Sequence, residues 1–483
     1  MPARTGQQYI DGLRAQEREI WLGGERVRDV TRHKGLSGGV KAIASLYDMQ
    51  HDPKLKKVMT YKSPTSGDRV GRSFSNPKTR EELETRTSMM LNWARTTNGM
   101  MGRSPDFMNV TFAAWGAAAD FFGEKRPEFG DNMRRYVEHL RENDVCLTHA
   151  LINLQRSRNV SGMFNLEEGT ALEVKKETSA GVVVHGARIL ATLGPLSDEI
   201  AVYSPRLARH SEAHSTFAMS FSIDCGTPGL KFMCRDSFDL GRSHFDAPLA
   251  SRFEEMDSVV IFDHVLIPWD RVFLCGDVAR CNGLYGETNA VVNMMHQVVV
   301  KDVVKSEFML GLAASIAEAS DAMTLPHVRE RLAEMIMTTE VMRACLRAAE
   351  ADAAPDRWGQ WMPARAPLDT ARNLFPRLYP RLVEIVQLNS SSSLMATPSE
   401  ADFASALLPE IERYFATAGA LARDRVALYR LAWDVAGSAF GGRQTLYERF
   451  FFGDPVRMAS ALVDNTDLKP LIARVTDFLK RPD

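Results

Sequence analysis

The stretch Met101–Asn109, which reads MGRSPDFMN, places an arginine, a serine, a proline and an aromatic ring in one short segment. Pro105 fixes its own φ and pushes Ser104 toward extended geometry, so the sequence predicts a stiff loop here and not a helix interior. A guanidinium on such a loop stays charged at any working pH and offers a planar fork of donors. Arg103 is therefore a candidate to receive a phenolate or a carboxylate beside the Phe107 ring. A surface loop with a solvated arginine is the alternative.

Two histidines lie in apolar stretches where they could carry chemistry. His149, in LTHALINLQRSR, is followed by Gln155 and Arg158, and His296, in NMMHQVVVKD, stands at the beginning of a long predicted helix. An imidazole next to amide and guanidinium donors can bind a polar ligand and move a proton near neutral pH. Each histidine can also be read as a hydrogen-bonded structural residue. Thr192, in ATLGPLSDE, is a hydroxyl at a predicted strand end, which by itself is typical of a turn.

Several common catalytic and binding motifs are absent from the sequence. We find no G-x-G-x-x-G after a strand, no Walker P-loop, no H-E-x-x-H and no G-x-S-x-G. If the chain is a redox enzyme, it must then receive its reducing equivalents without a nicotinamide site of the usual kind. The six cysteines form no C-x-x-C pair, so the sequence predicts no zinc ribbon, no disulfide scaffold and no metal centre.

The length and charge of the chain limit its class. With 483 residues it can form two or three domains with a sizeable core. Its 61 acidic and 59 basic residues nearly cancel, and without a long basic run the sequence predicts no nucleic-acid partner. The N-terminal residues lack the apolar core of a signal peptide, and no apolar run is long enough to span a bilayer. We therefore expect a cytoplasmic protein without a membrane segment.

The first 144 residues have mainly helical periodicity, with apolar residues at spacings of three and four. Gly23 and Gly24 mark the turn of a short hairpin over residues 20–30. The helices are expected over residues 5–17, 39–49, 79–95, 107–122 and 129–142. The sequence thus predicts an N-terminal, mainly α domain over residues 1–144.

The character of the sequence changes after Asp144. Short runs rich in β-branched and aromatic residues, separated by Gly, Pro, Asp or Ser, fill residues 145–277 and predict a middle β domain. Helical periodicity returns in residues 278–483 and predicts a C-terminal helical bundle. Its helices are expected over residues 298–319, 328–353, 368–388 and 411–439, with a final one near the terminus.

The most specific stretch is FDAPLASRFEEMDSVVIFDHVLIPWDRVFL, residues 245–274. It resembles the end of the middle domain in flavoproteins of the acyl-CoA dehydrogenase type, where a D-x-V-x-I-P turn leads into the bundle. With GRSPDF, THALIN, MMHQ and GSAFGGRQTLYERFFFGDP, the chain resembles, nearly end to end, the oxygenase components of the 4-hydroxyphenylacetate 3-monooxygenase family. The resemblance implies an α+β, acyl-CoA dehydrogenase-like subunit with an N-terminal α domain, a middle β-barrel and a C-terminal helical bundle, packed as a homotetramer.

The same resemblance implies an activity and its partners. Enzymes of this family hydroxylate a phenolic substrate at the ortho carbon to give a catechol, using FADH2 and O2. A separate NADH-dependent flavin reductase supplies the FADH2, with no stable complex required, which agrees with the missing dinucleotide motif. This chemistry needs an electron-rich, ionised phenol and a site that excludes water.

The resemblance also assigns roles by position. It implies that Arg103 and His149 hold the phenolic oxygen and, with His296, form the catalytic set. The other contacts that it implies are Ser104, Phe107, Ser204 and Pro205 toward the substrate, and His149, Gln155, Arg158, Thr192, Phe451, Phe452, Gly453 and Asp454 toward FAD. The family's 4-hydroxyphenylacetate enzymes carry a tyrosine where this chain has Phe107. One hydrogen bond to the substrate oxygen is therefore missing, and the identity of the phenol stays open.

A polar segment between two predicted strands, Pro205–Ser215, carries Arg206, Arg209, His210 and His214. In the enzymes that the chain resembles, the corresponding loop closes over the substrate. We therefore expect a lid that excludes water and contacts the tail of the substrate.

Other classes of protein use the same fold. A dehydratase similar to 4-hydroxybutyryl-CoA dehydratase would need cysteine ligands for an iron–sulfur cluster near residues 103–107 and after His296, and neither place has one. An acyl-CoA dehydrogenase-like flavoprotein is a further alternative. A non-catalytic assembly protein would keep the bundle without needing the polar residues described above.

Overall fold

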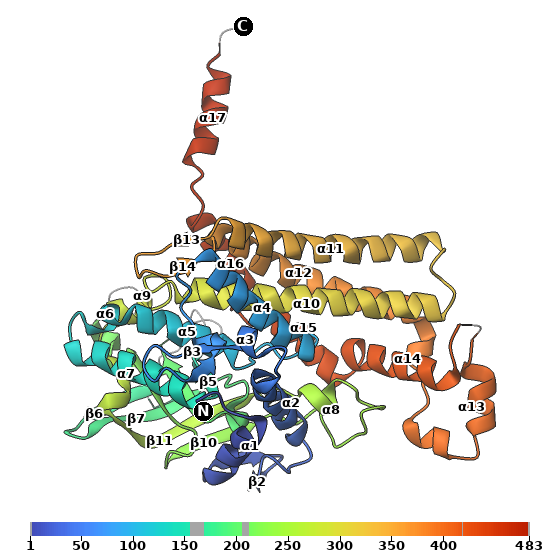
Figure 1. The fold of residues 1–483 in the computed structure, drawn as a ribbon, viewed down its shortest axis with the longest axis horizontal. Helices are drawn as coiled ribbons and strands as arrows, with labels where there is room; N and C mark the ends of the chain where they lie inside the picture. Colours follow the sequence, from blue (N-terminus) through green and yellow to red (C-terminus); the bar gives the residue numbers. More distant parts are fainter. Residues whose placement is uncertain (1, 155–168, 205–211, 418, 482–483) are drawn as a thin grey trace.

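The N-terminal third of the chain is mostly helical, as the sequence predicts. The computed structural model describes residues 2–154, 169–204, 212–417 and 419–481 (Figure 1). The helices of this region are α1 (Gly6–Ala15), α2 (Ser37–Asp48), α3 (Lys56–Met59), α4 (Arg80–Thr96), α5 (Asp106–Ala117), α6 (Ala119–Gly123) and α7 (Pro127–Asn143). The hydroxyls of Thr5 and Thr79 cap α1 and α4, because each accepts a hydrogen bond from an N–H of the first turn.

The sequence predicts one continuous helix over residues 107–122, but the structure has two. α5 ends at Ala117 and α6 begins at Ala119. The backbone leaves helical geometry at Ala118, two residues after Gly116, whose low helix propensity weakens the end of α5. Gly116 also lets α7 approach closely, since an added Cβ would lie 2.9 Å from a methyl group of Val137.

Most of the strands form two sheets. The six-stranded sheet has the order β2-β1-β10-β11-β7-β6, and the four-stranded sheet has the order β12-β9-β8-β5. Their strands are β1 (Glu19–Leu22), β2 (Glu25–Val27), β5 (Leu147–Ala150), β6 (Glu173–Glu177), β7 (Gly181–Arg188), β8 (Glu199–Tyr203), β9 (Met219–Asp224), β10 (Leu230–Cys234), β11 (Ser258–Pro268) and β12 (Val272–Cys275). Two short hairpins lie elsewhere: β3 (Thr60–Lys62) with β4 (Arg69–Gly71), and β13 (Ala354–Pro355) with β14 (Trp361–Met362).

The predicted β-barrel is not confirmed. Within the described ranges both sheets are open, with β2 and β6 at the edges of one and β12 and β5 at the edges of the other. The predicted N-terminal hairpin forms, but β1 pairs in parallel with β10, so the first 144 residues extend the larger sheet. The two sheets contact each other through buried rings, since Phe221 of β9 meets Phe262 of β11 edge-on with centroids 6.1 Å apart.

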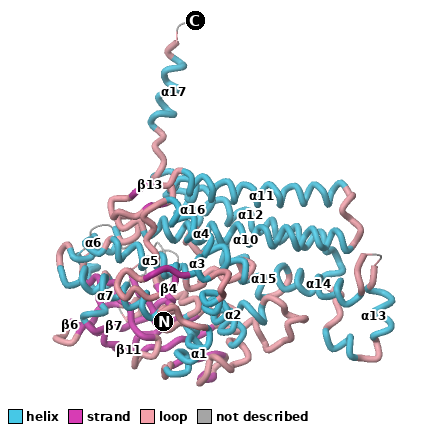
Figure 2. Tube along the Cα trace, in the orientation of Figure 1, coloured by secondary structure: helices cyan, strands magenta, loops and turns pink. Residues whose placement is uncertain are grey.

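The C-terminal part is a bundle in which three long helices lie side by side (Figure 2). The helix α8 (Ala250–Phe253) lies between β10 and β11. The helices that follow β12, up to Phe450, are α9 (Val278–Gly283), α10 (Ala290–Ala319), α11 (Pro326–Ala351), α12 (Arg365–Ser390), α13 (Leu408–Phe415), α14 (Ala422–Ala436) and α15 (Ala439–Phe450). α10 is buried along most of its length, including Lys301 and Lys305. Both ammonium groups are paired, at 2.7 and 2.6 Å, with Glu448 of α15, which offsets the cost of burying charge.

The prediction of a single helix over residues 411–439 is wrong. The chain leaves α13 after Phe415, makes a tight turn in which the Thr417 N–H donates to the Ala420 carbonyl, and begins α14 at Ala422. Gly419 lies in this turn, where a residue of low helix propensity favours the break.

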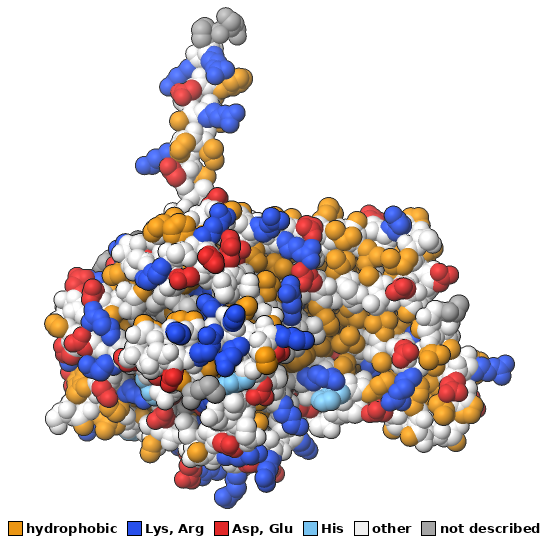
Figure 3. Space-filling view, in the orientation of Figure 1, with side chains coloured by type: hydrophobic (Ala, Val, Ile, Leu, Met, Phe, Trp, Pro, Cys, Tyr) orange, Lys and Arg blue, Asp and Glu red, His pale blue; other side chains and the backbone are white. Residues whose placement is uncertain are grey.

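The chain ends in two helices, α16 (Pro455–Asp464) and α17 (Lys469–Leu479). α17 projects away from the rest of the molecule, and its side chains lie in the open on the visible face (Figures 1 and 3). Among the residues that the structure describes, no helix combines the length and the apolar character needed to cross a membrane.

Candidate active site

Arg103 lies in the loop between α4 and α5, against a cluster of aromatic rings. Its guanidinium carbon is 3.9 Å from the ring centroid of Phe107, 4.7 Å from that of Phe451 and 5.6 Å from that of Tyr447. The preceding residue must be glycine, since a Cβ on Gly102 would lie 2.3 Å from the Tyr447 hydroxyl. The loop that the sequence predicts around Pro105 is confirmed, and it presents the guanidinium to a buried, apolar environment.

One nitrogen of this guanidinium is left free. Nη2 faces the Phe451 carbonyl at 3.5 Å, while Nη1 is buried and has no hydrogen-bond partner among the described residues. A buried donor without an acceptor costs on the order of 1–3 kcal/mol. An anion or a polar oxygen that reaches Arg103 would remove this cost.

His149 lies on β5 and also contacts Phe107. The two ring centroids are 5.7 Å apart, and the imidazole stacks on Tyr203, with centroids at 5.8 Å and an interplanar angle of 3°. Burial, with a smaller contribution from the charge of Arg103, lowers the pKa of His149 well below its ordinary value. His149 is therefore neutral at pH 7, with one ring nitrogen that can accept a hydrogen bond.

The loop is held in place by the buried carboxyl group of Asp106. Ser104 Oγ donates to Asp106 Oδ1 at 2.6 Å, and the side-chain amide of Gln297, from α10, donates to the same oxygen at 3.2 Å. Burial raises the pKa of Asp106 to about 6, against the opposite effect of these hydrogen bonds. The hydroxyl of Ser104, which the sequence predicts at the substrate, therefore fixes the loop.

A buried ionic network ties the same loop to the bundle. The Arg103 N–H donates to Glu255 Oε1 at 2.6 Å, and Arg443 of α15 donates to Glu255 Oε2 at 2.8 Å. Arg443 also forms a bidentate pair with Asp257, at 3.0 and 2.8 Å, and the Thr192 hydroxyl donates to Asp257 at 2.7 Å. The network links the positions of Arg103 and Thr192, which lie far apart in the sequence.

The segment after α15 brings a second aromatic wall. The Phe451 ring stacks on Tyr447 with centroids 5.0 Å apart, and Phe452 lies 4.1 Å from Phe451. Gly453 has a φ of +112°, a backbone conformation that favours glycine. Asp454 accepts a hydrogen bond from the Arg457 N–H and caps α16, so its carboxylate has a structural partner.

A cavity of about 270 Å³ opens beside this segment, between α12 and the chain from α15 to α16. Phe451, Phe452, Arg372, Arg377 and Arg449 are among its lining residues. Guanidinium groups bind phosphate and carboxylate well, so the cavity is suited to a ligand that carries negative charge.

Other predicted site residues have hydrogen-bond partners outside this cluster or lie outside the described residues. The imidazole of His296 is fully buried among α4, α10 and α11, where it contacts Glu350 at 3.0 Å and Thr87 at 3.3 Å. The Ser204 hydroxyl bonds to the backbone of β9 and the residues before it. Gln155, Arg158 and Pro205, with most of the predicted lid, lie outside the described residues.

Sequence reasoning missed several members of the cluster. Tyr203, which stacks on His149, and Tyr285, whose ring meets Tyr203 edge-on at 5.7 Å, gave no motif. The sequence did contain a signal for three other members, Glu255, Asp257 and Arg443. Two carboxylates placed directly before an apolar strand are expected to be buried, and buried carboxylates need a cation as a partner.

The sequence matches one family along almost its whole length. Residues 5–274 match 4-hydroxyphenylacetate 3-hydroxylase N terminal, and residues 281–480 match 4-hydroxyphenylacetate 3-hydroxylase C terminal. The oxygenase component of 4-hydroxyphenylacetate 3-monooxygenase from Geobacillus sp. (strain PA-9) is 44% identical over 482 residues, which cover 99% of this chain and 97% of that protein.

Solved structures agree with these matches. The crystal structure of an oxygenase component of 4-hydroxyphenylacetate 3-monooxygenase, complexed with FAD and 4-hydroxyphenylacetate, is 45% identical, with a TM-score of 0.94 over 99% of this chain and 98% of that chain. A 4-hydroxybutyryl-CoA dehydratase from N. maritimus shares the fold, with 18% identity and a TM-score of 0.88 over 99% and 96% of the two chains. The chain belongs to the 4-hydroxyphenylacetate 3-hydroxylase family.

Proposed function

We propose that this chain is the oxygenase component of a two-component, FADH2-dependent aromatic monooxygenase. It uses O2 to hydroxylate a phenol of the 4-hydroxyphenylacetate kind at the ortho carbon, and the product is a catechol. The observation that carries the proposal is that the Phe107 ring contacts both the buried, neutral imidazole of His149 and the guanidinium of Arg103, whose Nη1 has no partner in the described part of the chain. The relatives named above support the same activity.

The residues present fit FAD. The Thr192 hydroxyl and the segment from Phe451 to Asp454 would hold the cofactor, and the arginines of the adjoining cavity suit its anionic part. The unpartnered Nη1 of Arg103 offers a buried donor to a bound ligand. Reduced FAD, when bound, would supply the two electrons that activate O2; one oxygen atom of O2 enters the product and the other leaves as water. Gln155 and Arg158 are proposed as further contacts.

The chain's own residues prepare the phenol. A ring nitrogen of His149, which is neutral at pH 7, accepts a hydrogen bond from the phenolic hydroxyl. It takes the proton as the negative phenolate oxygen forms beside it, because that charge offsets the cost of a buried imidazolium. The guanidinium of Arg103 then binds the phenolate oxygen, whose negative charge makes the ortho carbon electron-rich. The rings of Phe107 and Tyr203, which are 1% and 0% exposed, exclude water from this side of the site.

Which phenol is bound depends on how its oxygen and its tail are held. Phe107 offers no donor, so in this chain the phenolic oxygen is bound by a charged group and an imidazole alone. Ser204 is proposed to lie near the substrate, although its hydroxyl bonds to backbone carbonyls. A substrate panel with and without a carboxylate tail, scored by product mass, would identify the phenol.

We also propose how the chain is organised and where it acts. Three domains, 1–144, 145–277 and 278–483, are proposed, with the middle one barrel-like. The boundary at residue 277 falls between the two family matches. A homotetramer is supported by the exposed apolar face of α17. A cytoplasmic location is supported by six free cysteines, since thiols stay reduced there. An NADH-dependent flavin reductase is the functional partner.

The test uses the full chain with an unrelated flavin reductase, NADH, FAD and 4-hydroxyphenylacetate. We expect catechol formation that needs both proteins, and no NADH oxidation by the chain alone. NADH oxidation by the pure chain at the rate of product formation would contradict the proposal.

Two matched variants assign the base. His149→Gln should lower the hydroxylation rate by about 10²-fold or more while FAD binding persists. His296→Gln should leave the rate per folded molecule close to wild type, because His296 contacts Glu350 and Thr87 instead. Equal losses in the two variants would contradict the role given to His149.

A further inference from the structure

The outer face of the six-stranded sheet carries two histidines and an aspartate that the proposed reaction does not use. They are brought together by a β-bulge in β11. Phe262 pairs with Gly186 of β7 and Val265 pairs with Val184, so Asp263 and His264 together oppose the single residue His185. A bulge of this kind turns two successive side chains toward one face of a sheet.

Burial along β11 confirms the shift. Side chains alternate between buried and more exposed positions up to Phe262, then Asp263 and His264 are both exposed, and Val265 is buried again. His264 has a φ of +53°, the left-handed conformation that residues other than glycine adopt at a cost. The backbone therefore accepts strain at the one position that adds a second imidazole to the group.

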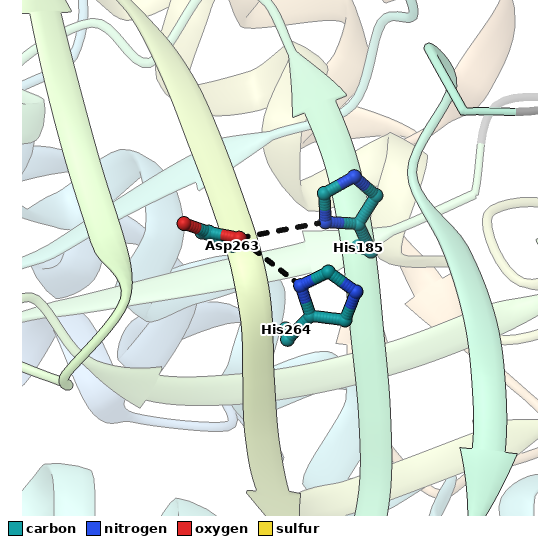
Figure 4. A group of neighbouring side chains, drawn as sticks. All are labelled: His185, Asp263 and His264. Carbon is teal, nitrogen blue, oxygen red and sulfur yellow. Dashed lines mark hydrogen bonds and ion pairs between the residues drawn. The ribbon is translucent and has the colours of Figure 1, made fainter.

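The three side chains point toward one another across the two strands (Figure 4). His264 Nδ1 is 3.0 Å and His185 Nδ1 is 3.9 Å from Asp263 Oδ1, and the two imidazole centroids are 4.3 Å apart. One ligand atom from each residue can lie within 4.8 Å of the others. A tetrahedral zinc ion, with bonds of about 2.0–2.2 Å, needs ligand atoms about 3.4 Å apart, so small rotations of exposed side chains would complete the site.

We propose that His185, Asp263 and His264 bind one divalent transition-metal ion such as Zn²⁺. Two imidazoles and a carboxylate are ligands that zinc accepts, with water in the remaining position, whereas Mg²⁺ and Ca²⁺ prefer sets of oxygen ligands. The bound ion links β7 to β11 across the bulge, where regular pairing between the two strands is interrupted. The metal thus stabilises the larger sheet and takes no part in the reaction at Arg103 and His149.

One neighbouring charge opposes the ion. Lys231 of β10 places its Nζ 3.7 Å from Asp263 Oδ2, where it competes for the carboxylate and repels a cation. The proposal therefore predicts opposite effects for two kinds of substitution. Removing a ligand should weaken metal binding, and removing Lys231 should strengthen it.

The experiment measures Zn²⁺ binding to the full chain, without an affinity tag, by equilibrium dialysis with metal analysis and by the change in Tm. We expect one equivalent per chain and a higher Tm with Zn²⁺ but not with Mg²⁺. His185→Gln and His264→Asn should weaken binding by about 10-fold or more, and asparagine keeps the left-handed backbone accessible. Lys231→Gln should bind more tightly than wild type.

The matched control is His327→Gln, which removes an exposed histidine at the start of α11. It should bind Zn²⁺ as wild type does. Absence of zinc binding by the wild-type chain, or equal binding by wild type, His185→Gln and His264→Asn, would overturn the proposal. A loss in His327→Gln that matches the loss in His264→Asn would overturn it as well, because binding would then not be specific to the bulge.

Discussion

At the scale of single residues, Phe107 is proposed to determine how the phenolic oxygen is held. Its ring contacts both Arg103 and His149 and carries no donor. Phe107→Tyr adds a hydroxyl to this ring, and a neutral hydrogen bond contributes about 1 kcal/mol. With 4-hydroxyphenylacetate we expect several-fold tighter apparent binding and less H2O2 released per NADH. The measurement is product and H2O2 at matched NADH use, and unchanged values for every phenol tested would show that position 107 does not touch the substrate.

Asp106 shows how the same loop depends on pH. Burial raises the pKa of its carboxyl from 3.8 to about 6, so the folded state binds this proton more tightly than the unfolded state. Its contribution to stability is therefore fully present below pH 3.8 and is lost as the pH rises through about 6. Asp106→Asn keeps an acceptor for Ser104 without the buried charge, and should raise the free energy of unfolding at pH 7.5 by roughly 1–3 kcal/mol.

Urea denaturation at pH 7.5 and pH 4.5 measures this difference. The gain from Asp106→Asn should shrink at the lower pH, where the wild-type carboxyl already carries its proton. Asp464→Asn, which changes an exposed carboxyl at the end of α16, is the control and should have little effect at either pH. A gain of the same size at both pH values would contradict the assigned titration.

The sequence could predict those features of the site that depend on residues close together in the chain. The stiff loop at Pro105 and the choice of His149 as a candidate follow from residue types that act within a few positions. The contact of His149 with Tyr203 and the contact of His296 with Glu350 depend on strand pairing and helix facing, which a single sequence does not determine. Charge balance was the unused signal, since buried Asp257 requires a cation and Arg443 supplies it.

At the scale of elements, Arg443 ties α15 to the sheets and to the Arg103 loop. Burial opposes ionisation of Asp257, yet Arg443 and Arg235 hold the pKa of that carboxyl well below its usual range. Arg443→Met leaves Asp257 and Glu255 buried with one cation fewer, and breaking a buried pair in this way costs about 3–5 kcal/mol. We expect a clear fall in Tm and a fall in coupling per folded molecule, because Glu255 also fixes the Arg103 backbone.

The conservative change separates charge from geometry. Arg443→Lys restores the charge but not the bidentate fork, so Tm should recover in part while coupling stays low. The readouts are a thermal melt and the ratio of product to NADH consumed. Wild-type coupling in both variants would show that the network stabilises the fold without positioning Arg103.

The helices and strands whose own sequence shows a regular apolar periodicity could be predicted. α1, α2, α4 and α7 lie within a few residues of the expected ranges. The larger sheet could not be predicted, because β1 reaches β10 across about two hundred residues and the pairing leaves no local pattern. A single short turn separates α13 from α14 within a long stretch of helical periodicity. Periodicity alone does not reveal such a break.

At the scale of the whole molecule, α17 has a face that nothing in the described chain covers. Leu471, Ile472, Val475, Phe478 and Leu479 fall on one side of the helix, and each is more than half exposed. Such a stripe on a helix that leaves the body of the molecule is costly in water unless another surface covers it. A second copy of the chain would cover it in the proposed tetramer, and exposed Ile336, Met337 and Val341 on α11 offer a further apolar surface.

Removing this stripe should therefore change the assembly and leave the fold intact. The triple variant Leu471→Ser, Val475→Ser and Phe478→Ser takes away three exposed apolar side chains but none from the core. We expect light scattering after size exclusion to show a species smaller than the wild-type assembly, with a far-UV spectrum like that of wild type. Arg474→Ser with Asp477→Ser, polar positions on the same helix, is the control and should keep the wild-type mass. If the triple variant keeps that mass at every concentration tested, α17 does not hold the subunits together, and the exposed residues of α11 become the next surface to test.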